Sequence, residues 1–189
     1  DNVEEYNGTS WTEVTNTSRD KFSSSNSSGT QTAGLVCGGY VEPASGAVNS
    51  TEEYDGTNWT SGGNYPLSIQ VGALIGTQTA ALFASGVEPS PSVTAVCNTY
   101  NGSSWTEIAE INTGRKQGTI GSGTTTDAII AGGRDNSNNA LSGAETWNGS
   151  SWTEVGDLNT ARFLASGSQN GVSTATIAAG GFVSPNNSM

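Results

Sequence analysis

The chain of 189 residues is the length of one ordinary domain, and its 26 Gly with only 12% charged residues exclude coiled coils and helical bundles. Its net charge of -11 makes nucleic acid and anionic membrane surfaces unfavourable partners, and no segment has the roughly 20 apolar residues that a membrane-spanning helix needs. The chain contains no His, the commonest general base and metal ligand, so we expect no enzymatic activity, no cofactor and no metal site.

A sequence motif centred on Asn-Gly or Asp-Gly occurs four times along the chain. Its copies lie at 5–12, 53–60, 99–106 and 146–153, and the last Trp of each copy steps by 48, 46 and 47 residues. A second signature, a small apolar run that ends in Gly-Gly or Ser-Gly, keeps the same period at 36–40, 83–87, 130–134 and 178–182. Two signatures in step predict tandem structural repeats with a period of about 47 residues.

Each repeat is predicted to contain four strands. Asn-Gly flanked by alternating residues is typical of a two-residue type I′ hairpin loop, which would place Tyr6 opposite Thr9 and diagonal to Trp11. The apolar run before Gly-Gly, such as 32–37, has the length of a buried strand. A further strand is expected before this run, near 21–25, 69–74, 117–121 and 163–166. Four strands in one period match the size of a propeller blade.

A four-stranded unit with Gly-Gly after its second strand, and with Tyr and Trp on its third and fourth, resembles the kelch repeat over essentially the whole chain. The motif Asn-Gly-Ser-Ser-Trp-Thr at 101–106 and 148–153 also resembles repeats in virion proteins of marine bacteriophages, notably cyanophages. The chain departs from the kelch pattern in its short Tyr-to-Trp spacing, in Ser85-Gly86 replacing Gly-Gly, and in Trp147 replacing Tyr. The resemblance implies an all-β propeller of four-stranded antiparallel blades.

The two ends of the chain are complementary parts of one blade. A third and fourth strand are expected around 3–13, and a first and second around 163–182, so joining them makes a complete blade without an open seam. We therefore expect one domain, 1–189, closed as a ring of four blades. A two-chain ring of eight blades and an arc of a longer ring are the alternatives. The predicted blades are 17–62, 63–109, 110–156, and a composite of 157–189 with 1–16.

Five of the six basic residues precede the first strand of a repeat: Arg19, Lys21, Arg115, Lys116 and Arg162. Arg19, Arg115 and Arg162 are the candidate residues of a shallow anionic-ligand site at the mouth of the channel. The alternative is that each packs on a neighbouring blade and pairs with acids such as Asp20 or Asp157. The second repeat has uncharged residues at 66–68, so a fourfold site would be incomplete.

Aromatic side chains give a second candidate site. The fourth-strand residues lie beside Asn and Asp and could stack against sugar rings, but packing between blades also explains a pair that recurs in every repeat. These candidates are Trp11, Trp59, Trp105 and Trp152.

Neither the acidic residues nor the variable loops indicate catalysis or a metal site. The adjacent carboxylates Glu4-Glu5 and Glu52-Glu53 point to opposite faces of a strand and cannot flank one bond.

The segments after Gly-Gly vary most, which is where specificity usually lies on a repeated scaffold. In one of them, oxygen-bearing residues at 135–139 could hold a hard cation, but their spacing matches no calcium loop and a solvated turn is expected.

These observations predict a non-enzymatic module for binding or assembly. By resemblance it is a phage virion structural protein or a host-surface adhesion protein, located on the virion or outside the cell. A carbohydrate-binding lectin with repeated sites on the blades is one alternative, and a kelch-like protein–protein interaction scaffold is another. The expected partners are other virion proteins or host-surface glycans, with a homo-oligomer also possible. Nucleic-acid binding and membrane insertion are not expected.

Overall fold

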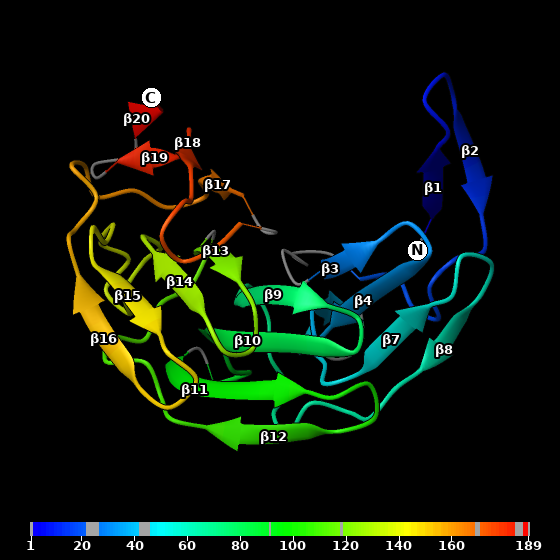
Figure 1. Ribbon diagram of the computed structural model, residues 1–189, viewed down its shortest axis with the longest axis horizontal. Coiled ribbons are helices and arrows are strands. Elements are labelled where there is room, and N and C mark those ends of the chain that lie inside the picture. The colour runs from blue at the N-terminus through cyan, green and yellow to red at the C-terminus, as the bar shows by residue number, and fades with distance from the viewer. Residues whose placement is uncertain are drawn as a thin grey trace.

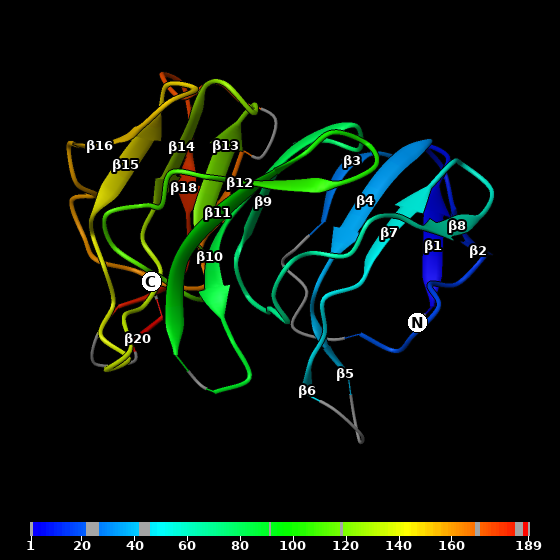
Figure 2. The same cartoon turned by 90° about the horizontal axis from the view of Figure 1, so that it is seen from below.

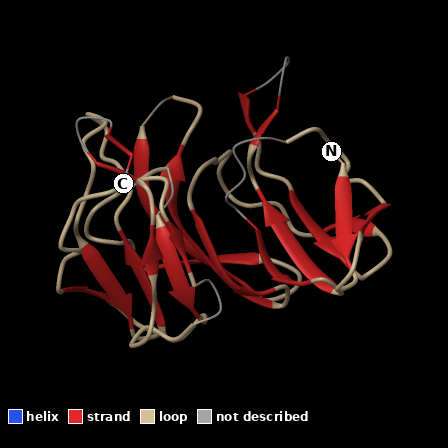
Figure 3. Cartoon of the chain, turned by 90° about the horizontal axis from the view of Figure 1, so that it is seen from above, coloured by secondary structure: helices blue, strands red, loops and turns tan. Residues whose placement is uncertain are grey.

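The computed structural model describes residues 2–21, 27–41, 46–90, 92–117, 119–168, 171–183 and 187–188. All strand pairing within these ranges is antiparallel, and Figure 3 shows strands joined by loops, which confirms the predicted all-β class. The described part of the chain contains no helix that is long and apolar enough to cross a membrane.

In the described part of the chain, three sheets have four strands each, as the repeat predicts. Sheet 1 consists of β3 (Ser27–Thr30), β4 (Ala33–Cys37), β7 (Thr51–Tyr54) and β8 (Trp59–Ser61). Sheet 2 consists of β9 (Ala73–Thr77), β10 (Ala80–Val87), β11 (Val93–Tyr100) and β12 (Trp105–Ile108). Sheet 3 consists of β13 (Ile120–Gly123), β14 (Ala128–Ala131), β15 (Ala144–Trp147) and β16 (Trp152–Val155).

The remaining strands form two-stranded units. The N-terminal hairpin joins β1 (Val3–Tyr6) to β2 (Trp11–Val14), and the C-terminal strand pair joins β17 (Ser166–Gly167) to β18 (Ala178–Ala179). Two short pairs follow Gly-Gly positions: β5 (Tyr40–Val41) with β6 (Gly46–Ala47), and β19 (Phe182–Val183) with β20 (Asn187–Ser188).

The sheets follow one another around an arc, as Figures 1 and 2 show from two directions. Strand β3 contacts β9, β9 contacts β13, and β13 contacts β17, so the first strands lie next to one another along the inner side of the arc. Buried side chains fill the spaces between neighbouring sheets. Leu35 and Phe83 share the cluster between sheets 1 and 2, and Ile75 and Ile130 share the cluster between sheets 2 and 3. Each sheet is therefore stabilised by its neighbours in the chain.

The two ends of the arc lie apart in Figure 1. The N-terminal hairpin and the C-terminal strand pair are separate sheets, and no strand pairing joins them among the described residues. Each is held by the sheet next to it: Tyr54 of sheet 1 donates to Glu5 of the hairpin at 2.7 Å, and β17 contacts β13 of sheet 3. The described residues do not form the expected composite sheet, and this structure does not show the predicted closed ring of four blades.

The loop at each Asn-Gly has four residues, and the predicted two-residue loop is wrong. Tyr6 pairs directly with Trp11, not with Thr9. The side-chain oxygen of Asn7 accepts the backbone N–H groups of the residues two and three positions later, at 2.9 and 3.0 Å. Gly8 has a φ of 94°, but Asn7 keeps a negative φ, whereas a type I′ turn requires positive values at both central positions. The Asn side chain therefore closes a longer loop.

The first strand of each repeat begins later than predicted. Strand β9 starts at Ala73 and β13 at Ile120, and the range predicted at 21–25 lies mostly outside the described residues. The preceding residues instead connect neighbouring sheets. The N–H of Ile69 donates to Val48 at 3.0 Å, and its carbonyl accepts from Gly39 at 2.8 Å. These non-local bonds compete with strand pairing, which local sequence patterns cannot reveal.

Candidate functional site

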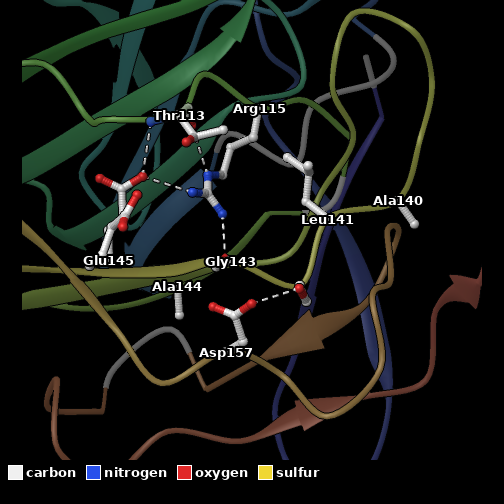
Figure 4. Close-up of a pocket in the computed structure, with 10 residues that line it drawn as sticks. Thr113, Arg115, Ala140, Leu141, Gly143, Ala144, Glu145 and Asp157 are labelled. Carbon is white, nitrogen blue, oxygen red and sulfur yellow. Dashed lines mark hydrogen bonds and ion pairs between the residues drawn. The ribbon is translucent and has the colours of Figure 1, made fainter.

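The candidate residue Arg115 is buried between sheets as part of an ion pair (Figure 4). It precedes β13, and its partner Glu145 lies on β15; both side chains are 1% exposed, and Nη2 lies 2.8 Å from Oε1. The carbonyl oxygens of Gly132 and Gly143 accept from Nη1 at 3.1 and 2.7 Å. Burial lowers the pKa of Arg115 from its ordinary value, and Glu145 opposes this shift.

The carboxylate of Glu145 is equally well satisfied. Asn112 donates to it through its backbone N–H at 2.7 Å and its side-chain amide at 2.9 Å, and the N–H of Thr113 donates at 3.1 Å. A buried charge is tolerated only when it is paired and hydrogen-bonded in this way. This arrangement, which we call the carboxylate socket, consists of Asn112, Thr113 and Arg115 around the Glu145 side chain.

The socket borders a cleft of about 360 Å³ that also includes Leu141, Ser142 and Asp157 (Figure 4). Ser142 donates to Asp157 at 2.9 Å, and Glu154 lies on the same lining. The positive charge of Arg115 is directed inward to Glu145, while the remaining ionisable groups of the lining are acidic. This cleft therefore does not have the electrostatics expected of an anionic-ligand site.

A second buried ion pair joins the segment before sheet 1 to its third strand. Lys21 contacts Glu52 on β7, with side chains only 4% and 3% exposed, and the N–H of Ser18 donates to the same carboxylate at 2.8 Å. Burial opposes the ionisation of Glu52, but the donors of Lys21 and Ser18 outweigh it and lower the pKa of Glu52 below its ordinary value.

The five basic residues predicted on one rim thus have different environments. Lys21 and Arg115 are buried against Glu52 and Glu145, acids that the sequence argument did not name as partners. Arg19 is exposed, and Arg162 is half-buried, donating to the carbonyl oxygens of Thr160 at 3.4 Å and Gly180 at 3.0 Å. Lys116 forms a backbone bridge with Arg134. The structure does not bring the three candidate arginines together as one array of exposed cations.

The four candidate tryptophans also differ in exposure. Trp152 is 7% exposed and donates through Nε1 to Ala109 at 3.1 Å, and the half-buried Trp105 donates to Thr51 Oγ1 at 2.9 Å. These two side chains pack within the shared cores of neighbouring sheets. Trp59 is half-buried, whereas Trp11 on the N-terminal hairpin is 65% exposed.

A groove of about 350 Å³ lies between the N-terminal hairpin and sheet 1. Its aromatic lining consists of two tilted ring pairs, Tyr6 with Trp11 and Tyr54 with Trp59, whose ring centroids lie 5.2 and 4.9 Å apart. The buried Nε1 of Trp59 has no acceptor among the described residues. Trp105 donates the equivalent hydrogen bond to the hydroxyl of Thr51, which lies one repeat earlier in the chain. One repeat before Trp59, the residue equivalent to Thr51 is Val3, which has no hydroxyl to accept this bond.

The predicted solvated turn at 135–139 is present. Asp135 accepts the backbone N–H of Asn139 at 2.8 Å and its side-chain amide at 2.9 Å, and these bonds lower the pKa of the carboxyl below its ordinary value. Its oxygens are therefore engaged within the turn. Among the described residues there is no cluster of three His, Cys, Asp or Glu side chains that could hold a metal ion.

No family model and no curated protein matches the chain. The fold is similar to that of a solved structure of YjhT, with a TM-score of 0.79 and 13% sequence identity. The similarity covers 99% of this chain and 70% of YjhT, so three tenths of that protein has no counterpart here. At this identity the likeness concerns the fold alone.

Sequence reasoning missed the two acids that hold the basic residues, although a signal for them exists. The segments before sheets 1 and 3 contain Asn-Thr-x-Arg at 16–19 and 112–115, and Glu52 and Glu145 occupy equivalent positions on their third strands. Before sheet 2, Leu67 replaces the arginine, and the third strand has Asn98 instead of Glu. In sheet 3 the motif arginine itself pairs with the acid, whereas in sheet 1 the acid pairs with Lys21, two residues after the exposed Arg19.

Proposed function

We propose that the chain is a kelch-like β-propeller module that acts in binding and assembly without catalysis, as a structural or host-adhesion component of a phage virion. The observation that carries this proposal is the distribution of exposed apolar side chains. Among the described residues, sheets 1 and 2 contain no exposed large hydrophobic side chain. All of them lie toward the ends of the arc: Tyr6, Trp11, Val155, Leu164, Val172, Ile177 and Phe182. Apolar surface gathered in this way is typical of contact sites.

The ionisable side chains support the non-enzymatic part of the proposal. Glu52 and Glu145 are buried in ion pairs, while Glu5 and Glu53 accept hydrogen bonds from the hydroxyls of Tyr54 and Tyr100. The first two carboxylates hold the segment that precedes their own sheet, and the other two join neighbouring repeats, so all four support a structural role.

Among the described residues, β1 pairs only with β2 and β18 only with β17, and their open edges support the proposal of a ring. A propeller completed by the N-terminal hairpin, with four blades in one chain or eight in two, would pair β1 with β18 and cover apolar surface at both ends. Contacts with other virion proteins would involve the outer loops, and the resemblance of the Asn-Gly-Ser-Ser-Trp-Thr phrase to cyanophage virion repeats supports that location.

Carbohydrate binding is a second candidate function, favoured by the groove beside Trp11. Its aromatic rings offer apolar faces, and the carboxylates of Glu4 and Glu5 offer acceptors. Sugar rings require this combination of stacking faces and polar groups. A glycan on a host surface would satisfy the adhesion role as well as the lectin role.

A glycan array with the purified chain, repeated at high salt, tests these functions. Adhesion predicts salt-resistant binding to a defined sugar, at least about tenfold weaker in Trp11→Ala because one stacking face is lost. Leu164→Ala is the matched control, since Leu164 is also exposed but lies outside the groove. Absence of binding would reject the glycan-directed roles, and loss of binding in both variants would reject the groove as the site.

A further inference from the structure

An uncharged cavity of about 350 Å³ lies where sheet 2 meets sheet 3, its neighbour along the arc in Figure 1. Thr99 and Tyr100 line it from sheet 2, and Thr125 and Trp147 line it from sheet 3. The cleft beside Arg115 and the groove between the hairpin and sheet 1 both contain carboxylates, whereas none of the described residues that line this cavity is charged. It shares no lining residue with the groove, so it is a separate feature of the surface.

The equivalent place one repeat earlier, between sheets 1 and 2, is bridged by the side chain of Gln78. This residue lies in the turn between β9 and β10, and its Nε2 donates to the carbonyl oxygens of Gly34 at 3.0 Å and Tyr54 at 2.7 Å. The two acceptors match the two N–H groups of a primary carboxamide. The backbone of one sheet therefore binds the carboxamide of the next.

In the third repeat, Thr125 replaces this glutamine. The sequence Gly-Thr-Gln-Thr at 76–79 becomes Gly-Thr-Thr-Thr at 123–126. Ala81 pairs with Tyr100 on sheet 2 as Gly34 pairs with Tyr54 on sheet 1, so these two carbonyls are the equivalent acceptors. In the described part of the chain, side-chain donors reach the carbonyls on sheet 1 but not those on sheet 2. The third repeat thus keeps the acceptors without the carboxamide.

The acceptors of sheet 2 face the cavity. The ring of Tyr100 packs in the cluster between sheets 1 and 2, and its hydroxyl donates to Glu53 of sheet 1. The side chain of Ala81 belongs to the same cluster. Because both side chains are directed toward sheet 1, the main chain of these residues is what sheet 2 presents on its other side. Tyr100 and Ala80, the neighbour of Ala81, both line the cavity.

A second replacement explains why the cavity is uncharged. Thr99 is the repeat equivalent of Glu53, whose carboxylate accepts the hydroxyl of Tyr100. Between sheets 1 and 2 this contact leaves no room for a Cβ at Gly62, whereas Ile108 at the equivalent position is partly buried against the core between sheets 2 and 3. A long amide and a carboxylate are therefore both replaced by short hydroxyl side chains.

The remaining polar groups of the lining are neutral. The hydroxyls of Thr79, Thr99 and Thr125 form no hydrogen bond with another described residue, and Asn101 uses only its oxygen, in its own loop. Hydroxyls can donate to a carbonyl oxygen, and the backbone carbonyls can accept N–H groups. A carboxylate would face carbonyl oxygens in a chain of net charge -11, and an ammonium would find no counter-charge in the lining. A neutral group with two N–H donors and one acceptor satisfies both sides.

We propose that the cavity between sheets 2 and 3 binds a primary carboxamide, in the place that Gln78 occupies between sheets 1 and 2. The two N–H groups of the ligand donate to the carbonyls of Ala81 and Tyr100, and its oxygen accepts from the threonine hydroxyls. Free glutamine and a glutaminyl side chain of a partner protein both present this group. The site goes beyond the proposed function and depends neither on assembly nor on glycan binding.

Titration of the purified chain with propionamide tests the site by backbone amide NMR. Propionamide has the terminal atoms of a glutamine side chain, and we expect saturable shifts at Thr125 and Asn101 with a Kd of the order of millimolar for so small a probe. N,N-Dimethylpropionamide lacks the N–H donors and propionate carries a charge, so each should bind at least about tenfold more weakly. Equal binding of the three compounds, or no saturable shift with propionamide, would overturn the proposal.

Filling the cavity from within the chain gives the matched variants. Thr125→Gln supplies the carboxamide itself and should weaken propionamide binding at least about tenfold. Thr106→Gln is the control, because it makes the same substitution at an exposed position of β12 outside the cavity, and it should bind as the parent does. The reverse change, Gln78→Thr, should create a second propionamide site, seen as new shifts at Gly34 and Tyr54. Retained binding in Thr125→Gln, or no new shifts in Gln78→Thr, would contradict the proposal.

Two further ligands distinguish the sources of the carboxamide. Tighter binding of free L-glutamine than of N-acetylglutamine N-methylamide would assign the site to a small molecule, and the reverse order would assign it to a partner's side chain. The corresponding glutamate compounds are the controls and should bind at least about tenfold more weakly. Equal binding of the glutamine and glutamate forms would overturn carboxamide recognition. None of these outcomes depends on the result of the glycan array.

Discussion

The hydroxyl of Tyr54 donates a hydrogen bond to Glu5, one repeat earlier in the chain, at 2.7 Å. Tyr100 makes the same contact with Glu53, so each contact joins the third strands of adjacent units. Where Thr99 replaces the acid, Trp147 replaces the tyrosine in the next repeat and donates to the carbonyl of Thr125 at 2.9 Å. The Tyr–Glu contact thus connects neighbouring units repeatedly, and where it is lost both of its residues are replaced.

These contacts predict late tyrosine ionisation. The hydrogen bond to Glu5 raises the pKa of Tyr54 to about 12, and burial together with the bond to Glu53 raises the pKa of Tyr100 to about 12. Because the folded pKa lies above the ordinary value of 10.0, the stabilisation is fully present below pH 10 and is lost as the pH rises through about 12. In an absorbance titration, Tyr54→Phe should remove one tyrosine from the late phase, and an unchanged late phase would contradict the assignment.

Breaking the pair of Arg115 and Glu145 should strongly destabilise the fold. Glu145→Ala leaves the guanidinium buried without its counter-charge, and we expect the free energy of unfolding to fall by about 3 to 5 kcal/mol. Urea unfolding measures the loss. Arg19→Ala provides the control and should change stability by less than about 0.5 kcal/mol, because that side chain is exposed. Equal effects of the two substitutions would show that the buried pair has no special role.

The ion pair of Glu52 predicts a loss of stability in acid. Its pKa is lowered in the folded state, so its contribution is present above the ordinary value of 4.5 and is lost as the pH falls through the lowered folded value. Glu52→Gln should be less stable than the parent at neutral pH and should lose less stability on acidification. Urea midpoints measured across this pH range give the comparison. Parallel pH profiles for the two proteins would remove Glu52 as a cause.

The four-residue loops predict two separable effects on unfolding. Asn148→Ala removes the acceptor of two backbone N–H groups, each at 2.9 Å, and should destabilise by about 1 kcal/mol. Gly149→Ala should cost about 1 kcal/mol because Gly149 has a φ of 90° and space for the added methyl group. Ser150→Ala is the control, since this exposed side chain makes none of these contacts. Denaturant midpoints unchanged in the first two variants would reject this account of the loop.

Much of the local architecture is readable from the repeat. The Asn-Gly phrase correctly predicts a hairpin joining the strands of Tyr6 and Trp11, and the apolar runs predict buried strands such as β4 and β10. The loop length was predicted wrongly because the Asn side chain, not the backbone alone, closes the turn. At Ser85, which replaces a glycine, φ is 63°, and the hydroxyl accepts the N–H of Arg115 at 2.6 Å, which offsets the strain.

The sequence by itself determined the all-β class, the period and the four strands of each internal repeat, because hairpins depend on neighbouring residues and on a two-residue alternation. Only the tertiary structure decided which charges are neutralised and which aromatic residues remain exposed. Arg115 and Arg162 share a motif, yet one meets Glu145 and the other meets no acid in the described residues. That difference depends on whether a third strand lies alongside, and strand neighbours far apart in the chain are set by packing between sheets.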